Sequence, residues 1–148
     1  MNDPENIELK ALIVEDTMED ARNFGQVLED SKFEVDYATT KDEAKKRLSD
    51  SVYNLIFLDI QLPMEDDGLE VLEFARMTTT NEEDLQFCRT NPSKNSNTPI
   101  VIISIRDDYR AFERANKPEN NIFEYLVKPI YIDVLRKVIK DVLTNLHS

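Results

Sequence analysis

Short uninterrupted apolar runs recur along the chain, and the segments between them place apolar residues three or four positions apart. The runs are typical of parallel strands buried on both faces, whereas the spaced repeats are typical of helices that bury one face. Strands are therefore predicted at residues 11–14, 33–37, 55–58, 100–103 and 123–127. In the second of these, apolar and polar residues alternate, which predicts a half-exposed strand at an edge of the sheet.

A helix is predicted after each strand. The apolar positions that define the helices are Ala21, Phe24 and Leu28, then Ala44 and Leu48, then Leu69 and Leu72, then residues 109–115, and finally Leu135, Ile139, Val142 and Leu146. Parallel strands joined by short helical connections need right-handed crossovers. Five such units predict an α/β fold, a doubly wound five-stranded parallel sheet with helices on both faces.

Residues 77–98 interrupt this rhythm between the third helix and the fourth strand, and we interpret them as an insertion. Thr80 and Glu83 have the spacing of a capping box, which predicts one more short helix through Leu85 and Phe87. The acidic residues 82–84 are expected in a solvated loop. The alternative is a docking surface for a partner, because loops longer than about 12–15 residues are often functional.

Size and charge narrow the class of protein. The 148 residues predict one domain spanning 1–148, with a core at about 9–146. A net charge of −12 argues against binding to nucleic acid or to an anionic membrane. The single cysteine, Cys88, excludes an internal disulfide and a Cys-rich zinc site. Short apolar runs and polar first residues predict a soluble cytoplasmic protein without a secretory signal.

Polar residues stand directly after four of the predicted strands. They are Glu15 and Asp16 after the first strand, Asp59 after the third, Ser104 after the fourth, and Lys128 with Pro129 after the fifth. In an open parallel sheet these strand ends lie along one edge, where ligands bind. The sequence therefore predicts that three carboxylates, a hydroxyl and an ammonium group meet in one crevice.

This combination points to phosphoryl transfer. Crowded carboxylates repel one another unless a cation offsets them, and oxygen ligands suit Mg²⁺ or Mn²⁺. Lys128 can pair with Asp59 or with a phosphoryl oxygen, and Ser104 can donate to another such oxygen. We therefore predict a site that receives a phosphoryl group on a carboxylate. Nucleotide-binding motifs of the GxxxxGK[ST] and GxGxxG types are absent from the sequence, and its one histidine is His147 near the end.

Taken together, these residues resemble the receiver domain of bacterial two-component response regulators, from Leu9 to Leu146. The resemblance implies the flavodoxin-like strand order 2-1-3-4-5 and identifies Asp59 as the acceptor of phosphate from a partner's phosphohistidine. It also implies a set of oxygen ligands for Mg²⁺, namely Glu15, Asp16, Asp59 and the backbone carbonyl of Gln61.

The remaining roles also come from this resemblance. Ser104 corresponds to the switch hydroxyl, Tyr125 to the aromatic switch, and Lys128 to the lysine that pairs with the carboxylate and the phosphoryl group. The bond between Lys128 and Pro129 is expected to be cis, an isomer that is cheap only before proline. Pro63, four residues after Asp59, matches the family as well.

The chain departs from the family's pattern at several positions. The segment from Asp59 to Gly68 is one residue longer, residues 121–122 replace the common Gly-Ala, and Ile105 stands where a small residue is usual. Bulk at Ile105 is expected to narrow access to the site. Our hypothesis is that Gln61, Ile105 and Arg106 together slow self-dephosphorylation, and the alternative for Arg106 is a solvated surface arginine.

Each site residue also has a plainer interpretation. Asp59 could be a satisfied aspartate at a strand end, Ser104 a buried hydroxyl, and Tyr125 a core tyrosine. Glu15 and Asp16 could form a helix N-cap, a role that is compatible with metal binding.

We interpret the chain as a single-domain response regulator. Its expected partners are a histidine kinase or phosphotransfer protein and a downstream protein target, with a homodimer through the face of the fourth helix, fifth strand and fifth helix as a candidate. It is expected not to be an enzyme beyond its own phosphotransfer and autodephosphorylation. The rivals are a binding-only pseudo-receiver and a phosphohydrolase, which usually has a second acid where Gln61 stands.

Overall fold

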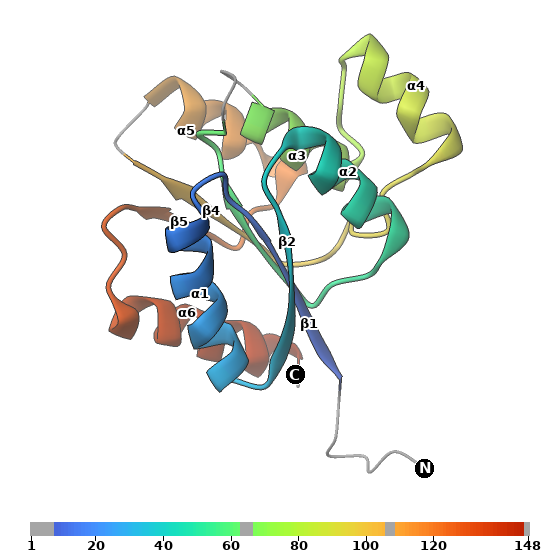
Figure 1. Cartoon of the computed structure of the whole chain (residues 1–148). Helices are drawn as coiled ribbons and strands as arrows, with labels where there is room; N and C mark the ends of the chain where they lie inside the picture. Colours follow the sequence, from blue (N-terminus) through green and yellow to red (C-terminus); the bar gives the residue numbers. More distant parts are fainter. Residues whose placement is uncertain (1–7, 63–66, 106–108, 147–148) are drawn as a thin grey trace, which may run out of the picture.

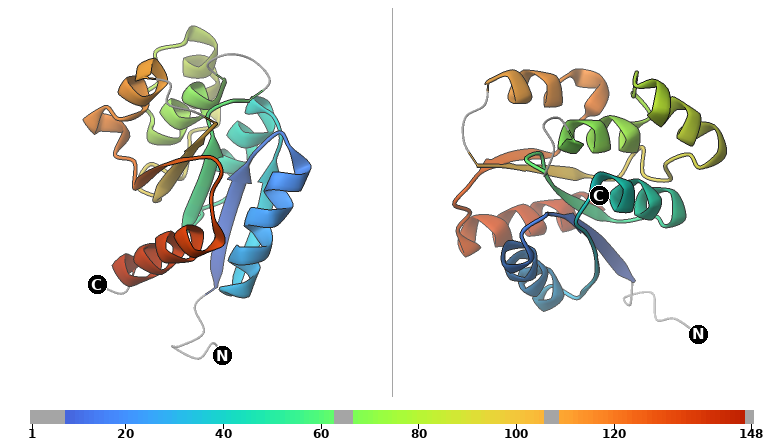
Figure 2. Two further views of the ribbon diagram at one scale, coloured as in Figure 1. Left: turned by 90° about the vertical axis from the view of Figure 1, so that its left-hand side faces the viewer. Right: turned by 45° about the horizontal axis from the view of Figure 1, so that its top comes forward.

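The computed structural model describes residues 8–62, 67–105 and 109–146, and it shows a parallel sheet between two layers of helices (Figures 1 and 2). The strands are β1 (Leu9–Val14), β2 (Phe33–Ala38), β3 (Leu55–Asp59), β4 (Ile100–Ser104) and β5 (Glu124–Val127). Their spatial order is β2-β1-β3-β4-β5, and every neighbouring pair is parallel. The fold class, the strand order and the edge position of the second strand are confirmed.

Helices cover both faces of the sheet. α1 (Met18–Asp30) and α6 (Ile132–Leu146) pack on one face, while α2 (Lys41–Asp50), α3 (Asp67–Arg76) and α5 (Tyr109–Ala115) pack on the other (Figure 2). A further helix, α4 (Glu82–Thr90), lies outside this second layer, and a 3₁₀ turn at Pro118–Asn120 precedes β5. In the part of the chain that the structure describes, no helix combines the length and apolar character needed to cross a membrane.

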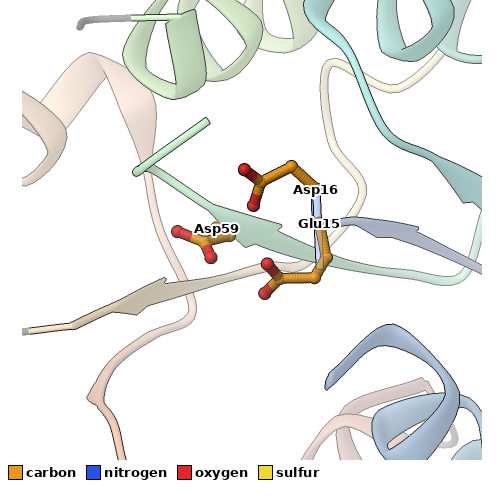
Figure 3. Close-up of side chains that lie close together, drawn as sticks. All are labelled: Glu15, Asp16 and Asp59. Carbon is orange, nitrogen blue, oxygen red and sulfur yellow. The ribbon is translucent and has the colours of Figure 1, made fainter. Parts of the chain in front are cut away.

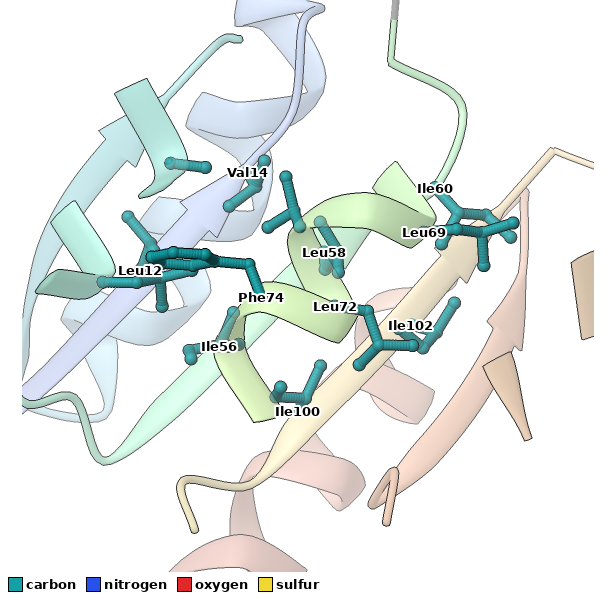
Figure 4. Packing of buried hydrophobic residues seen from close by; sticks show 14 of the residues in the cluster. Leu12, Val14, Ile56, Leu58, Ile60, Leu69, Leu72, Phe74, Ile100 and Ile102 are labelled. Carbon is teal, nitrogen blue, oxygen red and sulfur yellow. The ribbon is translucent and has the colours of Figure 1, made fainter. Parts of the chain in front are cut away.

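The central strands β3 and β4 are buried along their whole length. Side chains from alternate positions point to opposite faces, so each strand contributes to both halves of the core. On the α3 side, Phe74 and Leu72 pack among Leu12, Ile56 and Ile102 (Figure 4). This two-sided burial explains why these strands read as continuous apolar runs. Leu146, which we predicted on the buried stripe of the last helix, is instead exposed at the end of α6.

The extra helix differs from the prediction in two respects. Its N-cap is Asn81, whose side-chain oxygen accepts from the Asp84 N–H at 3.2 Å, so the predicted capping role of Thr80 is wrong. Asp84, expected in a solvated loop, is fully buried and pairs with the buried Lys45 of α2 at 2.7 Å. Lys45 also lies 5.1 Å from the ring centre of Phe87. These contacts attach α4 to α2.

Arg76, at the end of α3, joins the insertion to the loop before β5. Its buried guanidinium donates to the backbone carbonyls of Asn95, Asn120 and Asn121 at 2.7–3.1 Å. Burial lowers the pKa of Arg76 to about 10. The three carbonyl contacts balance the loss of hydration that burial imposes on the charge.

Candidate functional site: an acidic pocket at the carboxyl edge of the sheet

The sheet register brings the predicted site residues to one edge. Val14 pairs with Leu58, so Glu15 and Asp16 follow β1 beside Asp59 at the end of β3. Carboxylate oxygens of Glu15, Asp16 and Asp59 all lie within 4.8 Å of one another, and Figure 3 shows the three groups gathered in front of the strand ends. Asp59 and Glu15 are each 2% exposed, whereas Asp16 is exposed. The pocket therefore opens to solvent on the Asp16 side.

Lys128 lies at the centre of this acidic group. Its ammonium nitrogen is 3.1 Å from Glu15 Oε2, from Asp59 Oδ2 and from Asp20 Oδ2. Burial disfavours its charged form, but attraction to Asp59 and the hydrogen bonds that the ammonium donates to these carboxylates hold the pKa of Lys128 above its ordinary value. The predicted pairing of Lys128 with Asp59 is thus present. The Lys128–Pro129 peptide bond is cis, as the resemblance implies.

Asp20 was missed in the sequence. A signal for it existed, because Asp20 stands four residues after Asp16 and occupies the first turn of α1, on the side that faces the strand ends. Residues that follow a strand are easily noticed, whereas a carboxylate inside the next helix looks like an ordinary complement to the helix dipole.

The carboxyl group of Glu15 has a raised pKa. Burial, followed by the hydrogen bond and charge of Asp59, raises the pKa of Glu15 to about 8, against the opposing effect of Lys128. Glu15 Oε1 also accepts from the Thr17 N–H at 3.2 Å. The N-cap of α1 is Thr17, whose side chain makes no capping bond within the described residues. The plainer interpretation of Glu15 and Asp16 as the N-cap is therefore wrong.

Gln61 connects Asp59 to the end of β4. Its backbone N–H donates to Asp59 Oδ1 at 2.7 Å, and its side-chain nitrogen donates to Ser104 Oγ at 3.2 Å. The Ile105 N–H donates to the side-chain oxygen of Gln61 at 2.6 Å. Ser104 is fully buried. Ile105 is 54% exposed and, with Phe24 and other residues, lines a hollow of about 460 Å³ beside Lys128.

Tyr125 lies in β5 opposite Ile102, on the same face of the sheet as Ser104, because Ser104 pairs with Val127 two residues later. Its ring meets Phe112 of α5 edge-on, with 5.0 Å between the ring centres. The Tyr125 hydroxyl is buried and has no hydrogen-bond partner among the described parts of the chain. Two other residues of the prediction, Pro63 and Arg106, lie outside the described residues.

A family model for the response regulator receiver domain matches residues 11–140. Hybrid signal transduction histidine kinase B of Dictyostelium discoideum is 32% identical over 133 residues, which cover 88% of this chain and 6% of that protein. Response regulator ArlR of Staphylococcus saprophyticus is 29% identical over 126 residues, which cover 85% of this chain and 48% of ArlR. The chain thus spans about half of ArlR and a small part of the kinase.

Solved structures show the same fold. A two-component response regulator from Clostridium difficile superposes with a TM-score of 0.74 at 23% identity, covering 95% of this chain and 100% of the other. A CheY-like receiver domain from Methanospirillum hungatei gives a TM-score of 0.70 at 20% identity, covering 95% and 98% of the two chains.

Proposed function

This chain belongs to the response regulator receiver domain family, and from that premise we propose that it accepts a phosphoryl group on Asp59 and thereby switches a protein-interaction face. The observation that carries the proposal is the buried Asp59 carboxylate, 3.1 Å from the Lys128 ammonium and grouped with Glu15 and Asp16. A carboxylate at a strand end needs no such surroundings for stability, because grouped carboxylates repel one another.

The pocket's donor set fits Mg²⁺ or Mn²⁺. Glu15, Asp16 and Asp59 supply hard oxygen ligands within a span of 4.8 Å, and the backbone carbonyl of Gln61 follows Asp59 by two residues. Open access from the Asp16 side suits magnesium, which keeps several of its waters. When bound, the ion supplies positive charge that offsets the carboxylates and the transferred phosphoryl group.

The side chains of the pocket have distinct tasks in this proposal. A carboxylate oxygen of Asp59 attacks the phosphorus of a phosphohistidine, the P–N bond breaks, and the imidazole leaves with its electron pair. Lys128 offsets the charge that develops on the phosphoryl oxygens. Ser104 follows the phosphoryl group, and Tyr125 rotates into the space that this movement leaves. The chain performs its own phosphotransfer and autodephosphorylation, and it is not an enzyme with an external product.

The proposed donor is a histidine kinase or a phosphotransfer protein, and the proposed output is contact with a downstream protein in the cytoplasm. Because the insertion contributes α4, the switching face here consists of α5, β5 and α6. Large apolar residues on these elements and the turn between them are exposed, namely Tyr109, Phe112, Val127, Tyr131 and Ile132. This face is also the candidate surface for a homodimer. The net charge of −12 disfavours nucleic acid and anionic membranes as partners.

The test is the intact mass of the chain after incubation with acetyl phosphate and Mg²⁺. We expect a mass gain of one phosphoryl group in the wild type and none in Asp59→Asn. Asp141→Asn, which removes an exposed carboxylate of α6, is the matched control and is expected to behave like the wild type. Absence of labelling in the wild type, together with no binding of beryllofluoride, would favour a binding-only pseudo-receiver. Steady turnover of a model phosphate ester would favour a phosphohydrolase.

A further inference from the structure

The side chain of Gln61 is hydrogen-bonded to groups that lie next to Asp59, the proposed phosphoryl acceptor. Its carboxamide oxygen accepts from the Ile105 N–H at 2.6 Å, and its carboxamide nitrogen donates to Ser104 Oγ at 3.2 Å. Its backbone N–H holds Asp59 Oδ1 at 2.7 Å. One residue therefore joins the end of β3 to the end of β4 through three hydrogen bonds.

The position of these groups determines what else they can bind. Asp59 pairs with Ile103 in the sheet, so Ser104 and Ile105 are the next residues along the adjacent strand end. A backbone N–H and a hydroxyl beside an acceptor carboxylate are suitable donors for the oxygens of a tetrahedral anion. In the structure the Ile105 N–H instead binds a neutral carboxamide oxygen. A single N–H cannot form a strong hydrogen bond to the carboxamide oxygen and to an anionic oxygen at the same time.

We propose that the Gln61 side chain is a built-in occupant of the phosphoryl-binding position, which must swing away before an anion on Asp59 can be held by Ser104 and Ile105. This proposal rests on the proposed function and concerns the regulation of the same site. Gln61 is a positioning residue in this scheme. It makes no bond to phosphorus. It lowers the affinity of the pocket for a phosphoryl group by occupying the Ile105 N–H, while its carboxamide nitrogen holds Ser104 Oγ as an acceptor.

With acetyl phosphate the chemical step is balanced without Gln61. A carboxylate oxygen of Asp59 forms a bond to phosphorus, the bond from phosphorus to the acetate oxygen breaks, and acetate leaves with the electron pair. The Gln61 carboxamide exchanges its two hydrogen bonds for contacts with water. The Ile105 N–H then becomes available to the transferred group, and Ser104 Oγ is no longer held by the carboxamide nitrogen.

The experiment compares three variants with the wild type in binding beryllofluoride, a phosphoryl mimic, in the presence of Mg²⁺. Gln61→Met keeps the length of the side chain but cannot form either hydrogen bond, and Gln61→Ala removes the occupant. Both leave the backbone carbonyl proposed for Mg²⁺ in place. The matched control is Gln86→Met on the exposed surface of α4.

Loss of the competing hydrogen bond to the Ile105 N–H predicts that both Gln61 variants bind beryllofluoride about tenfold more tightly than the wild type, which is about 1.4 kcal/mol. Gln86→Met is expected to bind like the wild type. Affinities within twofold of the wild type for Gln61→Met and Gln61→Ala, or weaker binding by both, would overturn the proposal. The use of two variants guards against a change caused by the methionine itself.

A spectroscopic readout tests the contact directly. In the wild type without ligand, the amide proton of Ile105 is hydrogen-bonded to Gln61, so its NMR resonance is expected to move upfield in Gln61→Met and to stay unchanged in Gln86→Met. An Ile105 resonance unaffected by Gln61→Met would overturn the proposal. If neither the wild type nor any variant binds beryllofluoride, the proposed function fails as well. If all bind with equal affinity, only the role of Gln61 fails.

Discussion

The raised pKa of Glu15 predicts that binding of Mg²⁺ depends on pH. Glu15 is 2% exposed, and burial together with Asp59 raises its pKa to about 8. A carboxyl group must lose its proton before it can bind a metal. At pH 6 and pH 7 most of the molecules without metal carry that proton, so the apparent affinity for Mg²⁺ should rise about tenfold between these two values. Between pH 8 and pH 9 the rise should be less than about twofold.

Titration calorimetry from pH 6 to pH 9 measures this dependence. Repeating the titration at pH 7 in two buffers with different enthalpies of protonation counts the protons released, and we expect close to one per Mg²⁺ bound. Glu15→Gln should bind Mg²⁺ more weakly at pH 9 and lose most of the pH dependence. Glu119→Gln, which changes an exposed acid in the turn before β5, should retain it. A constant affinity from pH 6 to pH 8, without proton release, would refute the reasoning.

The same pKa has a consequence for stability without metal. The folded chain holds a proton on Glu15 up to about pH 8, whereas the unfolded chain loses it near the ordinary value of 4.5. The folded state therefore binds more protons between these two values. In this window the contribution of Glu15 to the free energy of unfolding falls as the pH rises. When the free energy of unfolding is measured in urea, its decrease from pH 6 to pH 8 should be smaller in Glu15→Gln than in the wild type.

Three further predictions concern the framework around the site. Asp84→Ala leaves the buried Lys45 ammonium without its 2.7 Å partner and should lower the free energy of unfolding by about 3 kcal/mol in urea titration. Arg76→Met leaves three backbone carbonyls without their donor and should lower the free energy of unfolding by about 2–4 kcal/mol, measured in the same way. Gly68→Ala should cost about 1–3 kcal/mol and lower the melting temperature, because an added Cβ would lie 2.3 Å from the Ile60 Cα.

Controls for these variants are available in the chain. Asp42→Ala removes the exposed partner of Lys45 at 3.7 Å and should change stability by less than about 0.5 kcal/mol. An equal effect of Asp42→Ala and Asp84→Ala would contradict the importance of burial. Gly25→Ala should be milder than Gly68→Ala, because its added Cβ would meet the hydroxyl end of the Tyr37 side chain, which can move, rather than backbone. The opposite order would contradict the packing argument at Gly68. Arg76→Met with wild-type stability would show that water replaces the guanidinium at those carbonyls.

The local pattern of the chain was sufficient to predict the architecture. β3 and β4 are covered by helices on both faces, so their residues are apolar at every position before the polar residue that ends each strand, and the runs that begin at Leu55 and Ile100 show this directly. Parallel strands also place their carboxyl ends at one edge. For that reason the sequence is sufficient to group Glu15, Asp16, Asp59 and Lys128, which lie together in the structure.

Two predictions about the helix α4 were wrong because the local sequence does not determine its N-cap residue or the burial of its acidic residues. Thr80 and Asn81 are both good N-cap residues, and the structure uses Asn81, which Thr80 precedes by one position. Asp84 was expected in solvent because acidic residues are seldom buried without a partner. Its partner, Lys45, is 39 residues away, and nothing in the spacing of the two residues reveals the pair.

The alternation of strands and helices can be predicted from the amino-acid sequence alone, because it follows from repeats of two to four residues. The polar groups at the strand ends can be predicted in the same way, because each directly follows an apolar run. Three contacts become visible only in the folded chain: Asp20 shares Lys128 with Asp59, Arg76 donates to three backbone carbonyls, and the Gln61 carboxamide lies between Ser104 and Ile105. These contacts join residues 19–108 positions apart. Their formation depends on how whole helices and strand ends pack, and a short-range sequence pattern does not predict that packing.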